Sequence, residues 1–315
     1  MDTNQITRVL SIYSRFYAGE GLNKRAIAAE FQVSEKTIQR DFNQIRDFLE
    51  QQGIQAPIRY NASEKKYFWH ERNSLLKPDV IYSTTKILLE SRAFLKNEMQ
   101  QIIEHLIGQI NLDQRKILQN VLSSDMSGYR NLQTNISVTN LLWQLAKEIE
   151  EKNCIRIVYT KEFNPSKKPT VLFPVGIIFS EYYFYLIAYQ TSFKPDYPTI
   201  YRIDRIQSLE SQPHFKPSYN IAYFSESAFR DRIQFMYTGA LMTIRFRFTG
   251  PSVQAVLDRI PTARQLHNNE FEAEVYGKGI KMWLLSQGPH IEVLSPASFR
   301  AEMKEEIQHM LSKYD

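Results

Sequence analysis

Seven polar residues in one short stretch of the chain have the side-chain types that hydrogen-bond base edges and phosphates. Glutamine and asparagine can pair with adenine, whereas lysine and arginine can pair with guanine or with phosphate. The seven residues are Ser34, Lys36, Thr37, Gln39, Arg40, Asn43 and Gln44. Their types and close spacing make them a candidate surface for contacting nucleic acid.

Helical periodicity predicts that these residues share one exposed surface. Apolar residues between positions 34 and 52 recur at intervals of 4, 3 and 4 residues, at Ile38, Phe42, Ile45 and Leu49. A helix over 34–52 therefore packs one face inward and turns its polar residues to solvent. Ser34 is a good N-cap for this helix.

Two further helices and a hairpin are predicted around it. Helices over 3–17 and 24–31 precede it, and a tight turn separates the second from the third. Two helices joined in this way are typical of a helix-turn-helix, whose second helix enters the major groove. Strands over 57–60 and 65–69 would form a wing suited to phosphate or minor-groove contact, with basic residues Arg59, Lys65 and Lys66. A three-helix scaffold with a solvated polar face is the alternative.

A second candidate site combines aromatic and basic side chains in strand-like segments. Its residues are Tyr159, Lys168, Tyr183, Tyr185, Arg202 and Arg205. Bases stack on aromatic rings, and arginine binds phosphate through two parallel hydrogen bonds. These residue types therefore favour a nucleotide or oligonucleotide ligand.

Strand alternation predicts which of these side chains share a face. One face would carry Tyr183, Tyr185, Ile187 and Tyr189, and the other would place Phe184, Leu186 and Ala188 in the core. Arg202 and Arg205 are three residues apart, so they face opposite sides unless the strand is interrupted between them. Whether one of them is instead a structural partner of Asp204 stays open at this stage.

The pattern of helices and strands along the chain predicts four domains or segments, over 1–72, 73–133, 134–212 and 236–315. The second part contains helices over 80–95, 99–110 and 113–122, then a polar linker over 123–134. The third contains a helix over 137–151 and strands over 154–159, 171–179, 182–189 and 199–209. The fourth contains strands over 241–249, 270–276 and 290–294, with helices beginning at Pro251 and Pro296. The predicted fold class is multidomain α+β.

Two motifs resemble known families. The run SEKTIQRDFNQI resembles the recognition helix of winged helix-turn-helix domains of the DeoR type, through Ser34, Thr37, Ile38, Arg40 and Asp41. The runs YYFYLIAY and YRIDRI resemble the WYL domain, a Sm-like β-barrel of bacterial regulators.

The WYL resemblance has two departures. Phe184, Tyr185 and Leu186 occupy the triplet that names the family, so phenylalanine replaces tryptophan. Thr170 stands where the family has an arginine four residues before a proline, with Lys167 and Lys168 nearby. The C-terminal α+β pattern resembles the WCX extension, which the family links to dimerisation and effector response.

Composition excludes several classes of protein. The 315 residues include 43% hydrophobic and 23% charged residues, as in ordinary globular proteins, and carry a net charge of +5. A single cysteine, Cys154, excludes an internal disulfide and a cysteine-based zinc site, and favours a reducing, cytoplasmic location. We recognise no signal peptide, membrane segment, nucleotide-binding glycine motif or metal motif.

These observations lead to one hypothesis and two rivals. The chain is predicted to be a non-enzymatic, homodimeric transcription regulator, with a repressor favoured, that binds operator DNA and senses a nucleotide or nucleic-acid ligand, without metal or cofactor. One rival is an accessory factor that binds single-stranded nucleic acid. The other is a nucleic-acid-processing enzyme.

Overall fold

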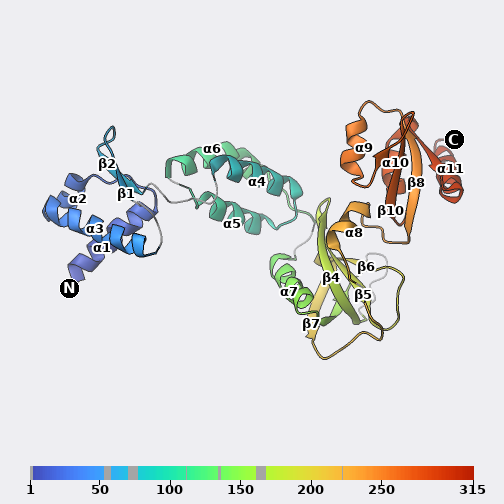
Figure 1. The fold of residues 1–315 in the computed structure, drawn as a ribbon, viewed down its shortest axis with the longest axis horizontal. Helices are drawn as coiled ribbons and strands as arrows, with labels where there is room; N and C mark the ends of the chain where they lie inside the picture. The colour runs from blue at the N-terminus through green and yellow to red at the C-terminus, as the bar shows by residue number, and fades with distance from the viewer. Residues whose placement is uncertain are drawn as a thin grey trace. The chain divides into compact units, whose positions relative to one another are not determined.

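The computed structural model describes residues 3–52, 58–69, 77–110, 112–133, 136–160, 168–221 and 223–315. The chain divides into two compact units, Met1–Leu132 and Gln133–Asp315, which we describe separately (Figure 1). Among the described residues, no helix combines the length and the apolar composition that crossing a bilayer requires.

The first unit begins with three helices, α1 (Thr3–Tyr17), α2 (Lys24–Glu30) and α3 (Glu35–Gln51). Asn23 caps α2 by accepting a hydrogen bond from the Ala26 amide at 3.1 Å, and Ser34 caps α3 by accepting one from the Thr37 amide at 3.1 Å. All four predicted apolar residues of α3 are buried against α1 and α2. The predicted helices, the cap at Ser34 and the inward face are confirmed.

A two-stranded hairpin, β1 (Ile58–Asn61) and β2 (Lys66–Trp69), follows α3. The backbone of Tyr67 exchanges two hydrogen bonds of 2.8 Å with Leu22, in the loop between α1 and α2. The Asn23 side chain donates a further hydrogen bond to the Lys65 carbonyl at 2.9 Å. The hairpin is therefore attached to the residues that precede α2.

Helices α4 (Pro78–Ser91), α5 (Lys96–Ile107) and α6 (Leu112–Gly128) share a second core within this unit. The prediction of a polar linker over 123–134 is wrong for its first half, because α6 continues to Gly128. Leu122, Met126 and Tyr129 pack into the core at helical spacing, and the Tyr129 hydroxyl donates to the Phe94 carbonyl at 2.6 Å. The predicted helix 80–95 ends at Ser91, where Arg92 adopts a left-handed φ of 54°.

The second unit begins with helix α7 (Thr139–Glu150) and a five-stranded antiparallel sheet. Its strands are β3 (Cys154–Tyr159), β4 (Thr170–Ser180), β5 (Tyr183–Gln190), β6 (Thr199–Arg202) and β7 (Ile206–Gln212), in the order β6-β5-β4-β3-β7. A 3₁₀ turn, Ile203–Arg205, interrupts the predicted strand 199–209. Since β6 and β7 are opposite edges joined by three residues, which span at most about 10 Å, the sheet must curl until its edges approach each other.

Helix α8 (Glu226–Arg232) lies in the stretch between the two predicted C-terminal parts, beside β4 (Figure 1). Phe229 of α8 and Ile233 after it pack on Ile178 and Ile187. Ile187 was expected on an open face with Tyr185, but it is fully buried because α8 covers that part of the sheet. Leu186 and Ala188 are buried as predicted.

A second sheet with the order β11-β8-β10-β9 completes the unit. Its strands are β8 (Leu241–Phe248), β9 (Arg264–Gln265), β10 (Glu270–Tyr276) and β11 (Ile291–Ser295), and its helices are α9 (Val253–Arg259), α10 (Ile280–Ser286) and α11 (Ala297–Leu311). The helix predicted to begin at Pro251 begins at Val253, because Ser252 supplies the cap.

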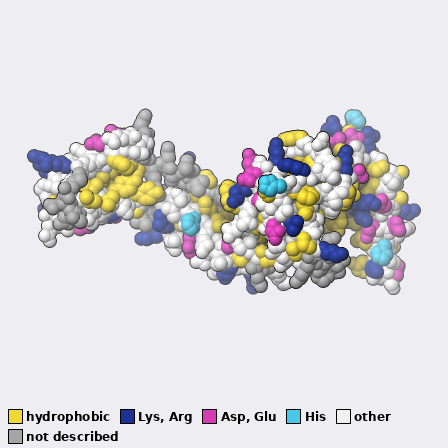
Figure 2. Space-filling view, turned by 90° about the horizontal axis from the view of Figure 1, so that it is seen from below, with side chains coloured by type: hydrophobic (Ala, Val, Ile, Leu, Met, Phe, Trp, Pro, Cys, Tyr) yellow, Lys and Arg dark blue, Asp and Glu magenta, His cyan; other side chains and the backbone are white. Residues whose placement is uncertain are grey.

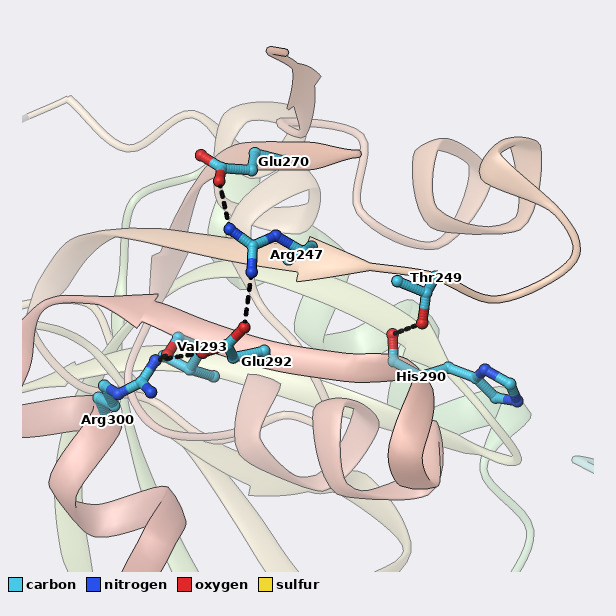
Figure 3. A network of polar contacts seen from close by, with 7 residues as sticks. All are labelled: Arg247, Thr249, Glu270, His290, Glu292, Val293 and Arg300. Carbon is cyan, nitrogen blue, oxygen red and sulfur yellow. Dashed lines mark hydrogen bonds and ion pairs between the residues drawn. The ribbon is translucent and has the colours of Figure 1, made fainter. Parts of the chain in front are cut away.

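The two faces of this second sheet differ in character. Alternate residues of β8 and β10 form an apolar core with the helices. On the opposite face Arg247 donates to Glu270 at 2.8 Å and to Glu292 at 2.9 Å, and Arg300 also pairs with Glu292 (Figure 3). On the face of the second unit drawn in Figure 2, basic and acidic side chains are likewise interspersed.

Candidate nucleic-acid interface and ligand site

The outer face of α3 presents a stripe of exposed polar side chains in its first three turns. Lys36, Arg40, Asn43 and Gln44 are exposed, and Thr37 and Gln39 are half-buried. The next residue along this stripe is Asp47, which is also exposed. Because a carboxylate repels phosphate, the surface suited to DNA ends after the third turn.

Ser34 and Thr37 act first as structural residues. In addition to the cap, their hydroxyl oxygens lie 2.9 Å apart and share a hydrogen bond. The cap fixes the position at which α3 begins. Any contact of these two hydroxyls with DNA would be additional to this structural bond.

A buried ion pair fixes α3 against α1. Arg8 donates to the Asp41 carboxylate from Nε at 2.6 Å and from Nη2 at 3.2 Å, and the two residues are 8% and 1% exposed. The hydrogen bond from Arg8 to Asp41 is the main cause that raises the pKa of Arg8, against the opposing effect of burial. Arg8 was missed from the sequence, although a charge four residues before buried Ile12 on the same helical face was a signal.

A chain of side-chain hydrogen bonds runs across the polar face of α3. Lys24 Nζ donates to Gln39 Oε1 at 2.9 Å, and Gln39 Nε2 donates to Asn43 Oδ1 at 2.9 Å. Arg46 donates to the same Asn43 oxygen from Nη1 at 3.0 Å and to the Ile58 carbonyl from Nε at 3.3 Å. The network joins α2, α3 and the hairpin, and sequence reasoning had named neither Lys24 nor Arg46.

The hairpin carries its three predicted basic residues on its surface. Arg59, Lys65 and Lys66 are all exposed. Lys24 lies 5.2 Å from the centre of the Tyr67 ring, and Tyr67 packs edge-on against Phe42 of α3. These contacts fix the hairpin relative to α3, so the basic residues of both have a defined spacing.

The structure brings most of the aromatic and basic residues of the second candidate site together on the curled sheet. Tyr185 pairs with Arg202 in register, and the Arg202 guanidinium lies 3.5 Å from the centre of the Tyr183 ring. The Tyr159 hydroxyl accepts a hydrogen bond from the Arg202 amide at 3.2 Å. Tyr183 and Tyr185 contact each other edge-on, with ring centres 6.3 Å apart.

Arg202 is also the structural partner of Asp204. Its Nη2 donates to Asp204 Oδ2 at 2.6 Å, and its Nε donates to Oδ1 at 3.1 Å. Burial lowers the pKa of Arg202, but hydrogen bonding and charge attraction to Asp204 outweigh it and raise the pKa above its usual value. A phosphate that binds Arg202 must therefore compete with Asp204.

The 3₁₀ turn interrupts the strand between Arg202 and Arg205, so strand alternation no longer places the two side chains on opposite faces. Burial raises the pKa of Tyr185, and the charges of both arginines oppose that rise. Both arginine charges thus act on the same tyrosine. Lys168 is exposed, and none of the contacts found among the described residues joins it to this group, while Lys167 lies outside those residues.

Comparison with known families identifies two parts of the second unit. Residues 140–211 match the WYL domain, and residues 240–311 match the WCX domain. The chain contains a WYL domain and a WCX domain. The resemblance of the segments 182–189 and 201–206 to the WYL domain is confirmed.

Two solved structures resemble the chain at low identity. Proteasome accessory factor B/C (PafBC) of Arthrobacter aurescens is 16% identical with a TM-score of 0.32, covering 99% of this chain and 48% of that one. A CRISPR Cas-related protein is 15% identical with a TM-score of 0.39, covering 67% of this chain and 61% of that one. The chain thus spans about half the length of the PafBC chain, and no curated protein matches it.

Within the WYL domain, the triplet that names the family divides between surface and core. Leu186 is fully buried, whereas Phe184 is half-buried and packs on Phe179 with ring centres 4.9 Å apart. Only Tyr185 of the triplet lies beside Arg202. Among the described residues, no group of three or more metal-ligating side chains occurs.

Helix α8 connects the WYL domain to the WCX domain. Glu226 accepts a hydrogen bond from the Ile177 amide of β4 at 3.2 Å, and Arg232 donates to Glu274 of β10 at 3.0 Å. Ile233 forms a parallel bridge with Tyr276 of β10. The helix therefore contacts the sheet next to the tyrosines and the WCX sheet at the same time.

Proposed function

We propose that the protein is a DNA-binding transcription regulator whose first 72 residues form a winged helix-turn-helix. The observation that carries the proposal is the exposed stripe of Lys36, Arg40, Asn43 and Gln44 on a helix held by a buried ion pair and a network of hydrogen bonds. In this arrangement α3 enters the major groove, and the hairpin contacts phosphate or the minor groove. Lys24 and Arg46 join the residues expected near DNA.

We further propose that the WYL domain, with its sheet curled as a Sm-like barrel, senses a nucleotide or an oligonucleotide. Tyr183 and Tyr185 offer stacking surfaces beside Arg202 and Arg205. A ligand changes DNA binding only if it binds the two functional states with different affinity.

A homodimer is part of this proposal. A dimer with two-fold symmetry would place two copies of α3 on the half-sites of a pseudo-palindromic operator. The WCX domain is proposed to assist both dimerisation and the response to the effector. The regulator is proposed to act as a repressor.

The test is binding of the purified full-length protein to the intergenic duplex upstream of its own gene, with and without short single-stranded oligonucleotides. We expect specific binding that weakens as salt rises, because Lys and Arg displace counterions from the phosphates. Arg40→Ala should weaken it at least about 10-fold, a loss of the size expected for a base or phosphate contact. The control, Arg264→Ala, removes an exposed arginine from strand β9 and should change nothing.

The aromatic surface also favours the rival function, binding of single-stranded nucleic acid as the main activity. Tight binding of single strands with no preferred duplex would support that rival and contradict the regulator. Specific duplex binding that the oligonucleotide releases would support the regulator and define the effector class. Unchanged duplex binding by Arg40→Ala would contradict the role of α3.

A further inference from the structure

The hydrogen-bond network on α3 has a cationic donor at each end. Lys24 Nζ donates into it at Gln39, and Arg46 Nη1 donates into it at Asn43. Lysine and arginine have no acceptor atoms, so each can be bonded only by an oxygen of its amide partner. The two cations therefore fix which way both amides are turned.

The orientation of Gln39 follows from Lys24, and that of Asn43 follows from Arg46. Gln39 must present Oε1 to Lys24, which leaves Nε2 to donate to its neighbour on the helix. Asn43 must present Oδ1 to Arg46, and the same oxygen accepts from Gln39 Nε2. The two requirements agree, so every hydrogen bond in the network joins a donor to an acceptor.

This arrangement determines which hydrogen-bonding groups of Asn43 remain available to a ligand. Oδ1 already accepts two hydrogen bonds, at 2.9 Å and 3.0 Å, which fills the capacity of a carbonyl oxygen. Nδ2 makes no hydrogen bond among those found between described residues, and Asn43 is exposed. Asn43 therefore offers donors to DNA and no acceptor.

Base edges in the major groove differ in the groups that they present. Adenine pairs with asparagine through one acceptor and one donor, and its donor requires the amide oxygen. Guanine presents two adjacent acceptors, N7 and O6. An amide that can only donate matches guanine and leaves the adenine N6 group without a partner.

We propose that Asn43 is a specificity-determining residue that selects guanine and rejects adenine in the operator half-site. This inference rests on the proposed function, since it requires α3 to lie in the major groove. Gln39 differs from Asn43, because its Oε1 accepts one bond and its Nε2 donates one. Gln39 therefore keeps one donor and one acceptor and remains suited to adenine.

The experiment is selection of duplexes from a randomised DNA library by the full-length protein, followed by sequencing. Asn43→Ala identifies the base that Asn43 contacts, as the position at which its selectivity relaxes. We expect the wild-type protein to prefer guanine over adenine at that position by about 5- to 100-fold, the discrimination typical of one good base contact.

Two further variants test the physical cause. Asn43→Asp keeps one oxygen for Gln39 and Arg46 and replaces the donor Nδ2 with an acceptor, so preference should move to cytosine, whose N4 donates. Arg46→Met removes the donor that fixes the orientation of Asn43 and should restore adenine to within a few-fold of guanine. Asn61→Asp adds the same charge in the hairpin and should lower affinity without changing base preference; circular dichroism verifies folding of all variants.

The outcomes separate the inference from the proposed function. A wild-type preference for adenine at the Asn43 position, or no position that relaxes in Asn43→Ala, overturns the inference while α3 remains a DNA-binding helix. Selection of no duplex at all by the wild-type protein contradicts the proposed function itself. Guanine at that position, with the expected change in Asn43→Asp, supports both.

Discussion

The carboxylate of Asp41 and the guanidinium of Arg8 form a paired set of hydrogen bonds across 33 residues of sequence, inside the first unit. Asp41 lies on α3 between the exposed residues Arg40 and Asn43. Asp41 itself is buried, so it points inward from the helix that we propose contacts DNA. The pair determines how α3 sits on α1. If α3 contacts DNA as proposed, Asp41 acts on DNA binding through the position of α3, without touching the ligand.

Removing the Asp41 carboxylate should destabilise the first unit. In Asp41→Ala the buried Arg8 charge loses its partner, and we expect a loss of about 3 kcal/mol in the free energy of unfolding. Urea unfolding of the full chain, followed through the transition of the first unit, measures it. Asp47→Ala, which removes an exposed carboxylate from the same helix, should stay within about 0.5 kcal/mol of wild type. Equal effects of the two variants would refute the structural role of the pair.

The N-cap of α3 separates a structural role of Ser34 from a DNA-binding role. Ser34→Ala should cost about 1 kcal/mol, because the Thr37 amide loses the Ser34 hydroxyl and keeps only the Ser34 carbonyl as acceptor. Ser34→Asp should retain the stability, because aspartate caps helices equally well. Its added negative charge should nevertheless weaken DNA binding if Ser34 lies near phosphate. Thermal unfolding and duplex binding of both variants measure the two effects, and a stable Ser34→Ala would show that the cap is unimportant.

The ion pair between Arg202 and Asp204 should limit the affinity of the WYL domain for phosphate-bearing ligands. Asp204→Asn removes the competing charge, so a fluorescently labelled single-stranded oligonucleotide should bind several-fold more tightly. Arg202→Ala should bind it more weakly. Asp196→Asn makes the same change of charge at an exposed residue of the loop between β5 and β6. Fluorescence anisotropy compares the three, and equal gains from both aspartate variants would indicate a general charge effect instead of a site at Arg202.

Phe229 should stabilise the contact of α8 with both domains of the second unit. Phe229 is 4% exposed and packs with Ile178 and Ile187 of the WYL sheet. The centre of its ring lies 5.1 Å from the centre of the Tyr276 ring in the WCX sheet. Phe229→Ala should cost about 3–4 kcal/mol. It should also speed proteolysis around α8, because the helix loses its main apolar contact.

Phe193→Ala is the control for this variant, since the Phe193 side chain is 55% exposed. It should leave stability and proteolysis unchanged. If Phe229→Ala also left stability and proteolysis unchanged, the apolar contacts of α8 would not be what stabilises its position between the two domains.

Local patterns in the sequence were sufficient to predict most elements of this protein, although not α8 or β9. The spacing of Ile38, Phe42, Ile45 and Leu49 predicted the buried face of α3, and Ser34 predicted where the helix begins. Alternation along 183–189 predicted that Leu186 and Ala188 are buried. Each of these depends on residues within a few positions of one another, because helix and strand periods and caps are local properties of the backbone.

The tertiary structure alone decided which distant residues meet. Nothing near Asp41 indicates Arg8, and nothing near Ile187 indicates that α8 covers it. The polar run 123–128 is helical, and Met126 and Tyr129 pack into the core shared with other helices. Arg202 precedes the turn at 203–205 and Arg205 ends it, and the charges of both act on Tyr185. Such pairings depend on the whole folded chain, since burial and charge compensation involve residues far apart in sequence, whereas local patterns report only which face of each element is apolar.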